Sequence, residues 1–225
     1  MRFKRYVVNL LTRTALHIKI LKGVLFFPLF TLNFLIPFLN YLVYKQYGVS
    51  DRLYTNFLEY SQWLMPLCAV WCSLFVLRDY LESEGNELLY VNSHSNKFAD
   101  VFLLFFLSLL NISAIFVVYS MLIPHMSYEY IKLISICIFY FGLVYGISFL
   151  TKSTTITTLI VVMYTLLNIC FQKNSKTVLF VYFSTEHISR KLFISDYLPL
   201  LLLGILFVTI GVFINIKKFR FHRHF

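Results

Sequence analysis

Apolar residues in this sequence occur in long uninterrupted blocks rather than in alternation with polar ones. Six blocks contain no Asp, Glu, Lys or Arg, and they cover residues 23–44, 60–77, 101–128, 133–151, 153–172 and 197–216. A helix of about 20 residues crosses the hydrocarbon core of a bilayer, so each block is long enough for one crossing. The pattern predicts an all-α polytopic membrane protein with six transmembrane helices in a single domain over residues 23–216, and it places both termini on one side.

The basic residues indicate which side that is. The flanks on the side of the termini carry 13 Lys and Arg residues, Lys97 among them, and the opposite flanks carry 7, including Lys132. Short cytoplasmic flanks hold the excess of Lys and Arg in membrane proteins. We therefore expect a multi-pass protein of the plasma membrane with both termini in the cytoplasm and a basic cytoplasmic tail over residues 217–225.

Residues 1–22 precede the first block and have a different periodicity. Their apolar side chains recur at intervals of three, four and seven, and basic or amide side chains lie opposite them. This spacing is typical of an amphipathic helix. We expect the helix to lie along the cytoplasmic membrane surface, where anionic lipid attracts basic side chains. The alternative is a basic flank that only fixes the topology of the first span.

Composition supports the membrane assignment and narrows the function. Hydrophobic residues make up 59% of the 225 residues and charged residues 13%, whereas soluble domains contain about 25% charged residues. The formal charge of +10 belongs to the flanks of the blocks, so it does not indicate a nucleic-acid partner. The chain has no phosphate-binding glycine loop, no hydrolase motif and no set of metal ligands. We expect a chain that is not an enzyme and binds no cofactor or metal. Because the blocks hold no ionisable side chain, the pattern also argues against ion or proton coupling.

The segment 78–100, between the second and third blocks, concentrates acidic residues. Five of the ten acidic residues of the chain lie here, although cytoplasmic loops usually carry positive charge. Leu81, Leu88 and Leu89 fall on one helical stripe. We expect an amphipathic helix that presents carboxylates to a cytoplasmic partner, and a simple solvated hairpin is the alternative.

The longest predicted outer segment covers residues 174–196. It mixes charged side chains with many aromatic and aliphatic ones. Such a segment is too apolar for a solvated loop, and it is too short and too charged for two further spans. We expect a loop that dips into the outer membrane interface.

The acidic segment also resembles a known motif. Residues 78–89 read Arg-Asp-Tyr-Leu-Glu-Ser-Glu-Gly-Asn-Glu-Leu-Leu, followed by two serines and Lys97. This run is similar to the cytoplasmic loop of ABC transporter permeases of the type-2 exporter class. Asp79 stands where that family usually has Glu, and Asn92-Ser93 stands where a Pro is expected. Six predicted spans, cytoplasmic termini, an amino-terminal helix and a dipping loop extend the resemblance over the whole chain.

The resemblance implies a half-transporter. Two such permeases, identical or related, would pair in the membrane, and two cytoplasmic ATPase subunits would drive them with ATP and Mg²⁺. The loop helix would couple the two parts. Its residues expected to contact the ATPase are Leu81, Glu82, Glu84, Gly85, Glu87, Leu88 and Leu89. Permeases of this size often belong to systems that export antimicrobial peptides or protect against them, which is an analogy at the level of the family.

A substrate path would then lie between the two permeases, along spans one, two and five. No charge is available there, so aromatic and small polar side chains would line it. The residues expected on the path are Phe30, Asn33, Phe34, Asn40, Trp63, Thr154 and Thr158. Alternatively, the aromatic side chains face lipid and the threonines bond their own helix backbone.

These expectations combine into two functional readings. The first is a permease subunit of an ATP-driven exporter that moves an amphipathic or hydrophobic substrate, such as a peptide, across the plasma membrane. The second is a membrane scaffold that transports nothing and recruits a cytoplasmic partner through the acidic helix.

Overall fold

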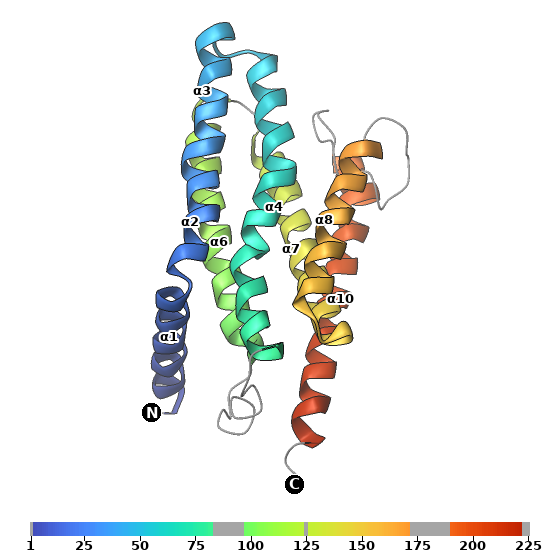
Figure 1. The fold of residues 1–225 in the computed structure, drawn as a ribbon. Helices are drawn as coiled ribbons and strands as arrows, with labels where there is room; N and C mark the ends of the chain where they lie inside the picture. Colours follow the sequence, from blue (N-terminus) through green and yellow to red (C-terminus); the bar gives the residue numbers. More distant parts are fainter. Residues whose placement is uncertain (1, 83–96, 124–125, 172–189, 222–225) are drawn as a thin grey trace.

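The computed structural model describes residues 2–82, 97–123, 126–171 and 190–221, and these residues form helices and short connections without a β-strand. The long helices run antiparallel in one bundle, with both termini at the same end (Figure 1). The elements are α1 (Arg2–Ile20), α2 (Lys22–Phe30), η1 (Thr31–Leu35), α3 (Ile36–Tyr47), α4 (Asp51–Leu81), α6 (Lys97–Ser120), α7 (Met126–Thr151), α8 (Thr154–Phe171), α9 (Arg190–Leu192), η2 (Phe193–Tyr197) and α10 (Leu198–Phe221). The prediction of an all-α chain is confirmed over the described residues.

Several helices have the length and composition of membrane spans. In the described part of the chain, five helical segments are long and apolar enough to cross a bilayer: Lys22–Tyr47, Asp51–Leu81, Lys97–Ser120, Met126–Thr151 and Arg190–Ile216. The fifth predicted span corresponds to a shorter apolar helix, Thr154–Cys170. Multi-pass membrane character is thus supported, whereas six crossings and the side of the termini stay predictions.

The boundary between the third and fourth predicted spans lies near Pro124. The third block predicts a longer helix that ends near this proline, and α6 ends at Ser120 while α7 begins at Met126, inside the same apolar block. Proline cannot continue a helix and disfavours helical geometry in the residue before it, so Pro124 requires a break near this point.

Other helices extend past the apolar blocks into charged sequence. α4 begins at Asp51, well before the predicted start at residue 60, and ends at Leu81. The last helical segment begins at Arg190 instead of Tyr197, so the end of the predicted dipping loop belongs to it. Residues 174–189 lie outside the described residues. Residues 2–20 are helical as predicted, and their position along a membrane surface stays a prediction.

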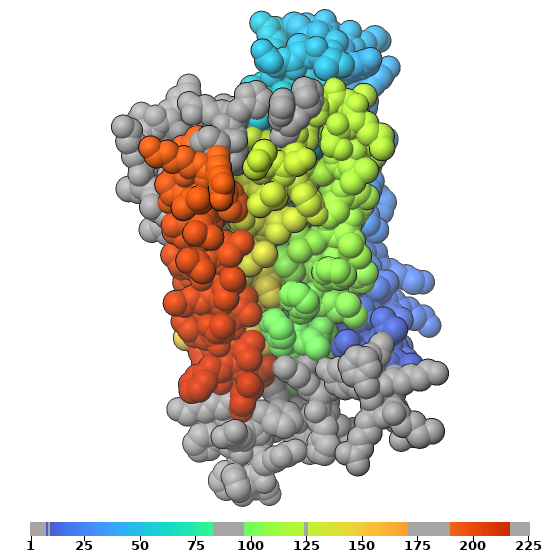
Figure 2. Space-filling model, turned by 180° about the vertical axis from the view of Figure 1, so that it is seen from behind, coloured from blue at the N-terminus to red at the C-terminus, as the bar shows by residue number. Residues whose placement is uncertain are grey.

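The centre of the bundle is formed by α4 and α7. In their most apolar windows 67% and 78% of the residues are buried, against 22% to 33% in the other three long segments. α7 packs against α4, α6, α8 and α10, and α10, α7 and α6 lie side by side on the face shown in Figure 2. The two most buried helices therefore hold the peripheral ones in place.

Contact between α7 and α10 is unusually close because glycines face each other. A Cβ atom added at Gly142 would collide with the backbone oxygen of Gly204, and one at Gly146 would lie 2.7 Å from the backbone oxygen of Phe207. One turn further along, a Cβ at Gly211 would lie 2.6 Å from the Tyr145 ring. Small residues let helix backbones approach in this way within membranes. The Gly142–Gly146 pair is thus part of a packing contact.

The first long segment contains a widened turn at its middle. Over η1 the backbone N–H of Ile36 donates to the carbonyl oxygen of Thr31, a step of five residues instead of four. Pro28 and Pro37 flank this turn. Proline removes backbone donors from an α-helical ladder, and π-type turns are one way in which a helix accommodates an extra residue.

Candidate functional site

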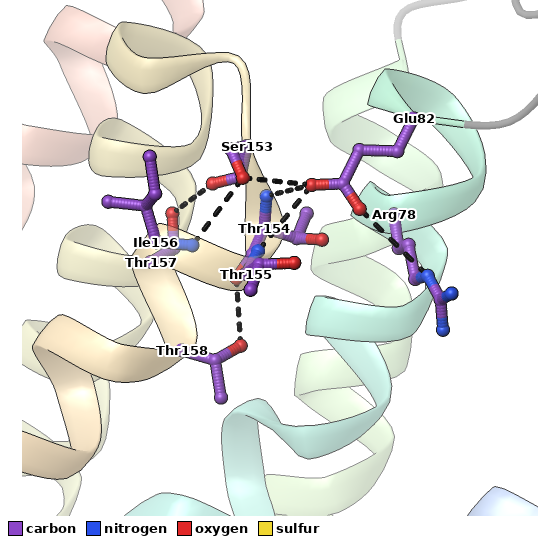
Figure 3. A network of polar contacts seen from close by, with 8 residues as sticks. All are labelled: Arg78, Glu82, Ser153, Thr154, Thr155, Ile156, Thr157 and Thr158. Carbon is purple, nitrogen blue, oxygen red and sulfur yellow. Dashed lines mark hydrogen bonds and ion pairs between the residues drawn. The ribbon is translucent and has the colours of Figure 1, made fainter.

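The acidic loop predicted to bind a partner begins with a contact inside the chain. Glu82, directly after α4, accepts a hydrogen bond at 2.6 Å from the backbone N–H of Thr154 and one at 3.1 Å from the Ser153 hydroxyl. Thr154 is the first residue of α8 and Ser153 directly precedes it (Figure 3). The first N–H groups of a helix have no partner within the helix and favour an anion. Glu82 therefore joins the start of the loop to the start of α8, and we call this contact the Glu82 cap.

The connection between α7 and α8 presents these groups to Glu82. Lys152 has a φ of 57°, a left-handed conformation that turns the chain sharply between the two helices. The Ser153 hydroxyl also accepts a hydrogen bond from the backbone N–H of Ile156, at 3.4 Å. Partial burial acts to raise the pKa of Glu82, but the hydrogen bonds from Thr154 and Ser153 outweigh it and hold the pKa below its ordinary value. Glu82 is therefore ionised at neutral pH, as the cap requires.

A groove of about 520 Å³ opens beside the Glu82 cap, between α4 and α8. We call it the α4–α8 groove, and its lining residues are Trp71, Leu74, Phe75, Arg78, Thr154, Thr155, Thr158, Leu159 and Val162. Two predicted path residues, Thr154 and Thr158, lie here. The Thr158 hydroxyl donates to the backbone oxygen of Thr154 at 2.8 Å, so its donor is used within the helix, as the alternative reading expects.

A second groove lies between α3 and α6 and holds the two predicted asparagines. It has a volume of about 420 Å³ and is lined by Asn33, Pro37, Asn40, Tyr41, Tyr44, Leu53, Ile115, Val118, Tyr119 and Leu122. Asn40 is buried and accepts a hydrogen bond from the Asn56 amide of α4 at 3.1 Å. The exposed Asn33 amide donates to the backbone oxygen of Leu29. This α3–α6 groove has polar groups but no charged side chain in its lining.

The predicted path residues do not gather in one cavity of this chain. Phe30 and Phe34 are exposed and stack with ring centroids 5.0 Å apart. Trp63 is half-buried on α4, beside Tyr60. The asparagines and the threonines line two different grooves. A path lined by all of them would require a second chain.

The predicted partner-binding residues can be placed only in part. Leu81 is buried in the hydrophobic core of its own chain, and Glu82 forms the cap described above. Leu81 is thus used in the packing of its own chain, whereas Glu82 is exposed as well as bound to the start of α8. The others (Glu84, Gly85, Glu87, Leu88 and Leu89) lie outside the described residues.

A buried polar cluster that the sequence analysis did not predict joins α1 to the bundle. The Tyr80 hydroxyl donates to Asp100 at 3.0 Å and lies 3.1 Å from the His17 Nε2, while Arg13 forms an ion pair of 3.5 Å with Asp100. Burial lowers the pKa of His17, against the opposing effect of Asp100 and Asp79. Lys97, one of the basic residues counted in the flanks, is buried with its ammonium over the Tyr80 ring. The cluster holds α1 against α4 and α6.

A second buried cluster occupies the opposite end of the bundle. Glu129 accepts a hydrogen bond from the Tyr54 hydroxyl at 2.8 Å and forms an ion pair of 3.1 Å with Lys132. The ammonium of Lys132 also lies 5.6 Å from the centre of the Tyr197 ring. Lys132 was predicted as an outer flank, but both charged side chains are buried within α7. The view that the spans hold no ionisable residue is therefore wrong, and the argument against ion coupling loses its basis.

Comparison with known proteins adds no assignment. No family model, no curated protein and no solved structure matches this chain. The function is therefore argued from the residues and their geometry.

Proposed function

We propose that this chain is a permease subunit of an ATP-driven exporter that moves an amphipathic or hydrophobic substrate, such as a peptide, across the plasma membrane. The observation that carries the proposal is the Glu82 cap. Glu82 belongs to the segment 78–89, whose sequence resembles a coupling loop, and its carboxylate is bound to the start of α8.

The cap gives the loop a direct connection to three helices. The loop continues from α4 at one end and enters α6 at the other, and Glu82 adds the link to α8. A partner that displaces the loop would therefore move the ends of α4, α6 and α8 together. A scaffold that only recruits a partner would need no such link, so the geometry favours the exporter.

The energy source in this proposal is a separate chain. Because the sequence contains no phosphate-binding loop, ATP and Mg²⁺ would be held by a cytoplasmic ATPase that contacts the remaining acidic residues of the loop. The buried Glu129 and Lys132 neutralise each other at 3.1 Å, which suits a structural contact better than an ion-binding site. Cytoplasmic termini and pairing with a second permease chain belong to the same proposal.

The α3–α6 groove is the best candidate for the substrate within one chain. Its volume lies within the range of small-molecule sites, and it is mostly apolar with a few amide and phenol groups. An uncharged lining excludes strong binding of an ionic solute. It suits an apolar side chain or acyl group whose neighbouring amides reach Asn33 or the tyrosines.

The coupling role of the Glu82 cap predicts an effect on activity rather than on assembly. In the chain copurified with the cytoplasmic ATPase of this proposal, Glu82→Gln should lower substrate-stimulated ATP hydrolysis about tenfold. The reason is that a hydrogen bond to a charged group contributes about 1.5 kcal/mol or more. Leu88→Asp should instead abolish copurification, because it places a charge on the apolar stripe of the loop.

The matched control is Glu59→Gln, an exposed carboxylate on the same helix as the residues before the cap. It should leave both measurements unchanged. Full stimulation in Glu82→Gln would remove the coupling role of the cap. Failure of the wild-type chain to copurify with any ATPase would overturn the exporter itself.

The groove assignment predicts that a bulky residue at Asn33 blocks transport. Asn33→Trp should reduce export of the substrate by an order of magnitude or more without lowering the amount of folded protein, because the indole would fill the mouth of the groove. Phe38→Trp is the control, since Phe38 is exposed on the same helical segment and does not line the groove. Equal transport by the two variants in vesicles would place the substrate elsewhere.

A further inference from the structure

The α4–α8 groove changes in character along its length. Trp71, Phe75 and Arg78 lie three or four residues apart on α4, so they share one face of that helix. On α8, Thr155 lies near the start of the helix, whereas Val162 lies two turns further along. Because the two helices run antiparallel (Figure 1), the cation and the hydroxyls lie at one end of the groove and the aromatic and aliphatic side chains lie toward the middle of the bundle.

Arg78 retains hydrogen-bonding capacity at the open end. Its side chain is 65% exposed, and its Nε lies 3.9 Å from Glu82, which is beyond hydrogen-bond distance. Figure 3 shows the two terminal guanidinium nitrogens directed away from the Glu82 carboxylate. The other carboxylate oxygen of Glu82 is engaged with α8. The guanidinium can therefore bind a further anion at the edge of an apolar groove.

This combination is the one that an anionic phospholipid fits. Arginine recognises phosphate with two parallel N–H donors, while an acyl chain lowers its free energy by packing on apolar side chains. Arg78 and Thr154 of the groove lie where α4 ends and α8 begins, at the end of the bundle that carries both termini (Figure 1), and the flanks on that side hold most of the basic residues. A soluble anion would leave the walls formed by Trp71, Phe75 and Leu159 uncovered.

We propose that the α4–α8 groove binds one anionic phospholipid of the bilayer, with its phosphate on Arg78 and an acyl chain along Trp71 and Val162. The lipid bridges α4 and α8 beside the Glu82 cap, and the site does not depend on the chain being an exporter. Thr154 and Thr158, which we expected on a substrate path, form part of this lipid site.

Tryptophan fluorescence can test the proposal, because the chain has only two Trp residues, at positions 63 and 71. The full chain with Trp63→Phe is placed in phosphatidylcholine nanodiscs that contain a small fraction of phospholipid brominated on its acyl chain. Brominated phosphatidylglycerol should quench Trp71 about fivefold more effectively than the same fraction of brominated phosphatidylcholine, as expected for one cationic contact.

Two arginine variants identify the contact. Arg78→Gln should remove the preference for phosphatidylglycerol, and Arg78→Lys should retain most of it, which separates loss of charge from damage to the fold. Arg52→Gln is the control, because Arg52, near the start of α4, lies over the ring of Tyr47 at the end of α3 and does not line the groove. Equal quenching by both lipids in the parent protein, or a preference that survives Arg78→Gln, would overturn the proposal. Weak quenching by both lipids would show that a second copy or another protein covers the groove, which would overturn it as well.

Discussion

Replacing Gly142 with alanine should prevent stable packing of α7 against α10. A single added methyl group would collide with the backbone of Gly204, and a backbone atom cannot move aside by changing a rotamer. α7 and α10 would have to move apart, which would also loosen the close packing at Gly146 and Gly211. Overpacking of buried sites costs about 1–3 kcal/mol and sometimes more, and we expect the upper part of that range. Thermal unfolding in detergent, followed by size-exclusion chromatography, would measure the loss.

Gly23→Ala is the matched control for this prediction. Gly23 lies in α2, and a Cβ atom built on it meets no other atom within 4 Å. The same chemical change there should be neutral or slightly stabilising, because alanine favours a helix over glycine by about 1 kcal/mol. If the two variants unfold at the same temperature, the close contact between α7 and α10 is not present in the protein.

The second large effect is expected at the buried ion pair of α7. Glu129→Gln should destabilise the protein by about 3–5 kcal/mol, because it leaves the buried ammonium of Lys132 without its counter-charge. Lys132→Met should act in the same sense by isolating the carboxylate. The double variant should recover much of the loss, since two neutral side chains of similar size remove both charges together.

Unfolding of the two single variants and of the double variant would measure the coupling between the two positions. Glu59→Gln, at an exposed carboxylate, should change stability by less than about 0.5 kcal/mol and serves as the control. Additive losses, with the double variant less stable than either single one, would contradict a buried ion pair.

The apolar blocks predicted the long helices well but not where they end. Each predicted span ends where a charged residue occurs, because the blocks were chosen to contain no Asp, Glu, Lys or Arg. Glu129 and Lys132 could therefore not be placed inside α7. Those charges are tolerated because they meet each other and because Tyr54 and Tyr197 come from distant parts of the chain. The sequence carries no local sign of such long-range partners.

The glycine contact, by contrast, left a signal that could have been used. The Gly142–Gly146 spacing alone indicates a packing face, but it does not name the opposing helix. Gly204 and Gly211 are seven residues apart in the last block, and two glycines on one helical face are a matching surface. Pairing the two patterns would have predicted that α7 and α10 are neighbours.

The candidate site was predicted in part for similar reasons. The acidic composition of the loop drew attention to Glu82, but a carboxylate can bind a partner or the start of a nearby helix. Glu82 binds the start of a helix because Ser153 and Thr154, about 70 residues further along the chain, lie beside the end of α4. The predicted path residues line two different grooves because of how the helices are arranged in space. Residue type alone does not reveal that arrangement.

The widened turn over Thr31–Leu35 has a consequence for how the first long segment can vary in length. A five-residue step holds one more residue than an ordinary turn, so deletion of one residue there would restore a regular helix instead of breaking it. The residues after the turn would keep their orientation, because the wide turn takes up the extra residue, and Asn40 would still face Asn56. A one-residue deletion elsewhere in the segment would instead rotate every later residue by about 100°. Thr31–Leu35 is thus the place where the first long segment can lose one residue without changing which helix faces are neighbours.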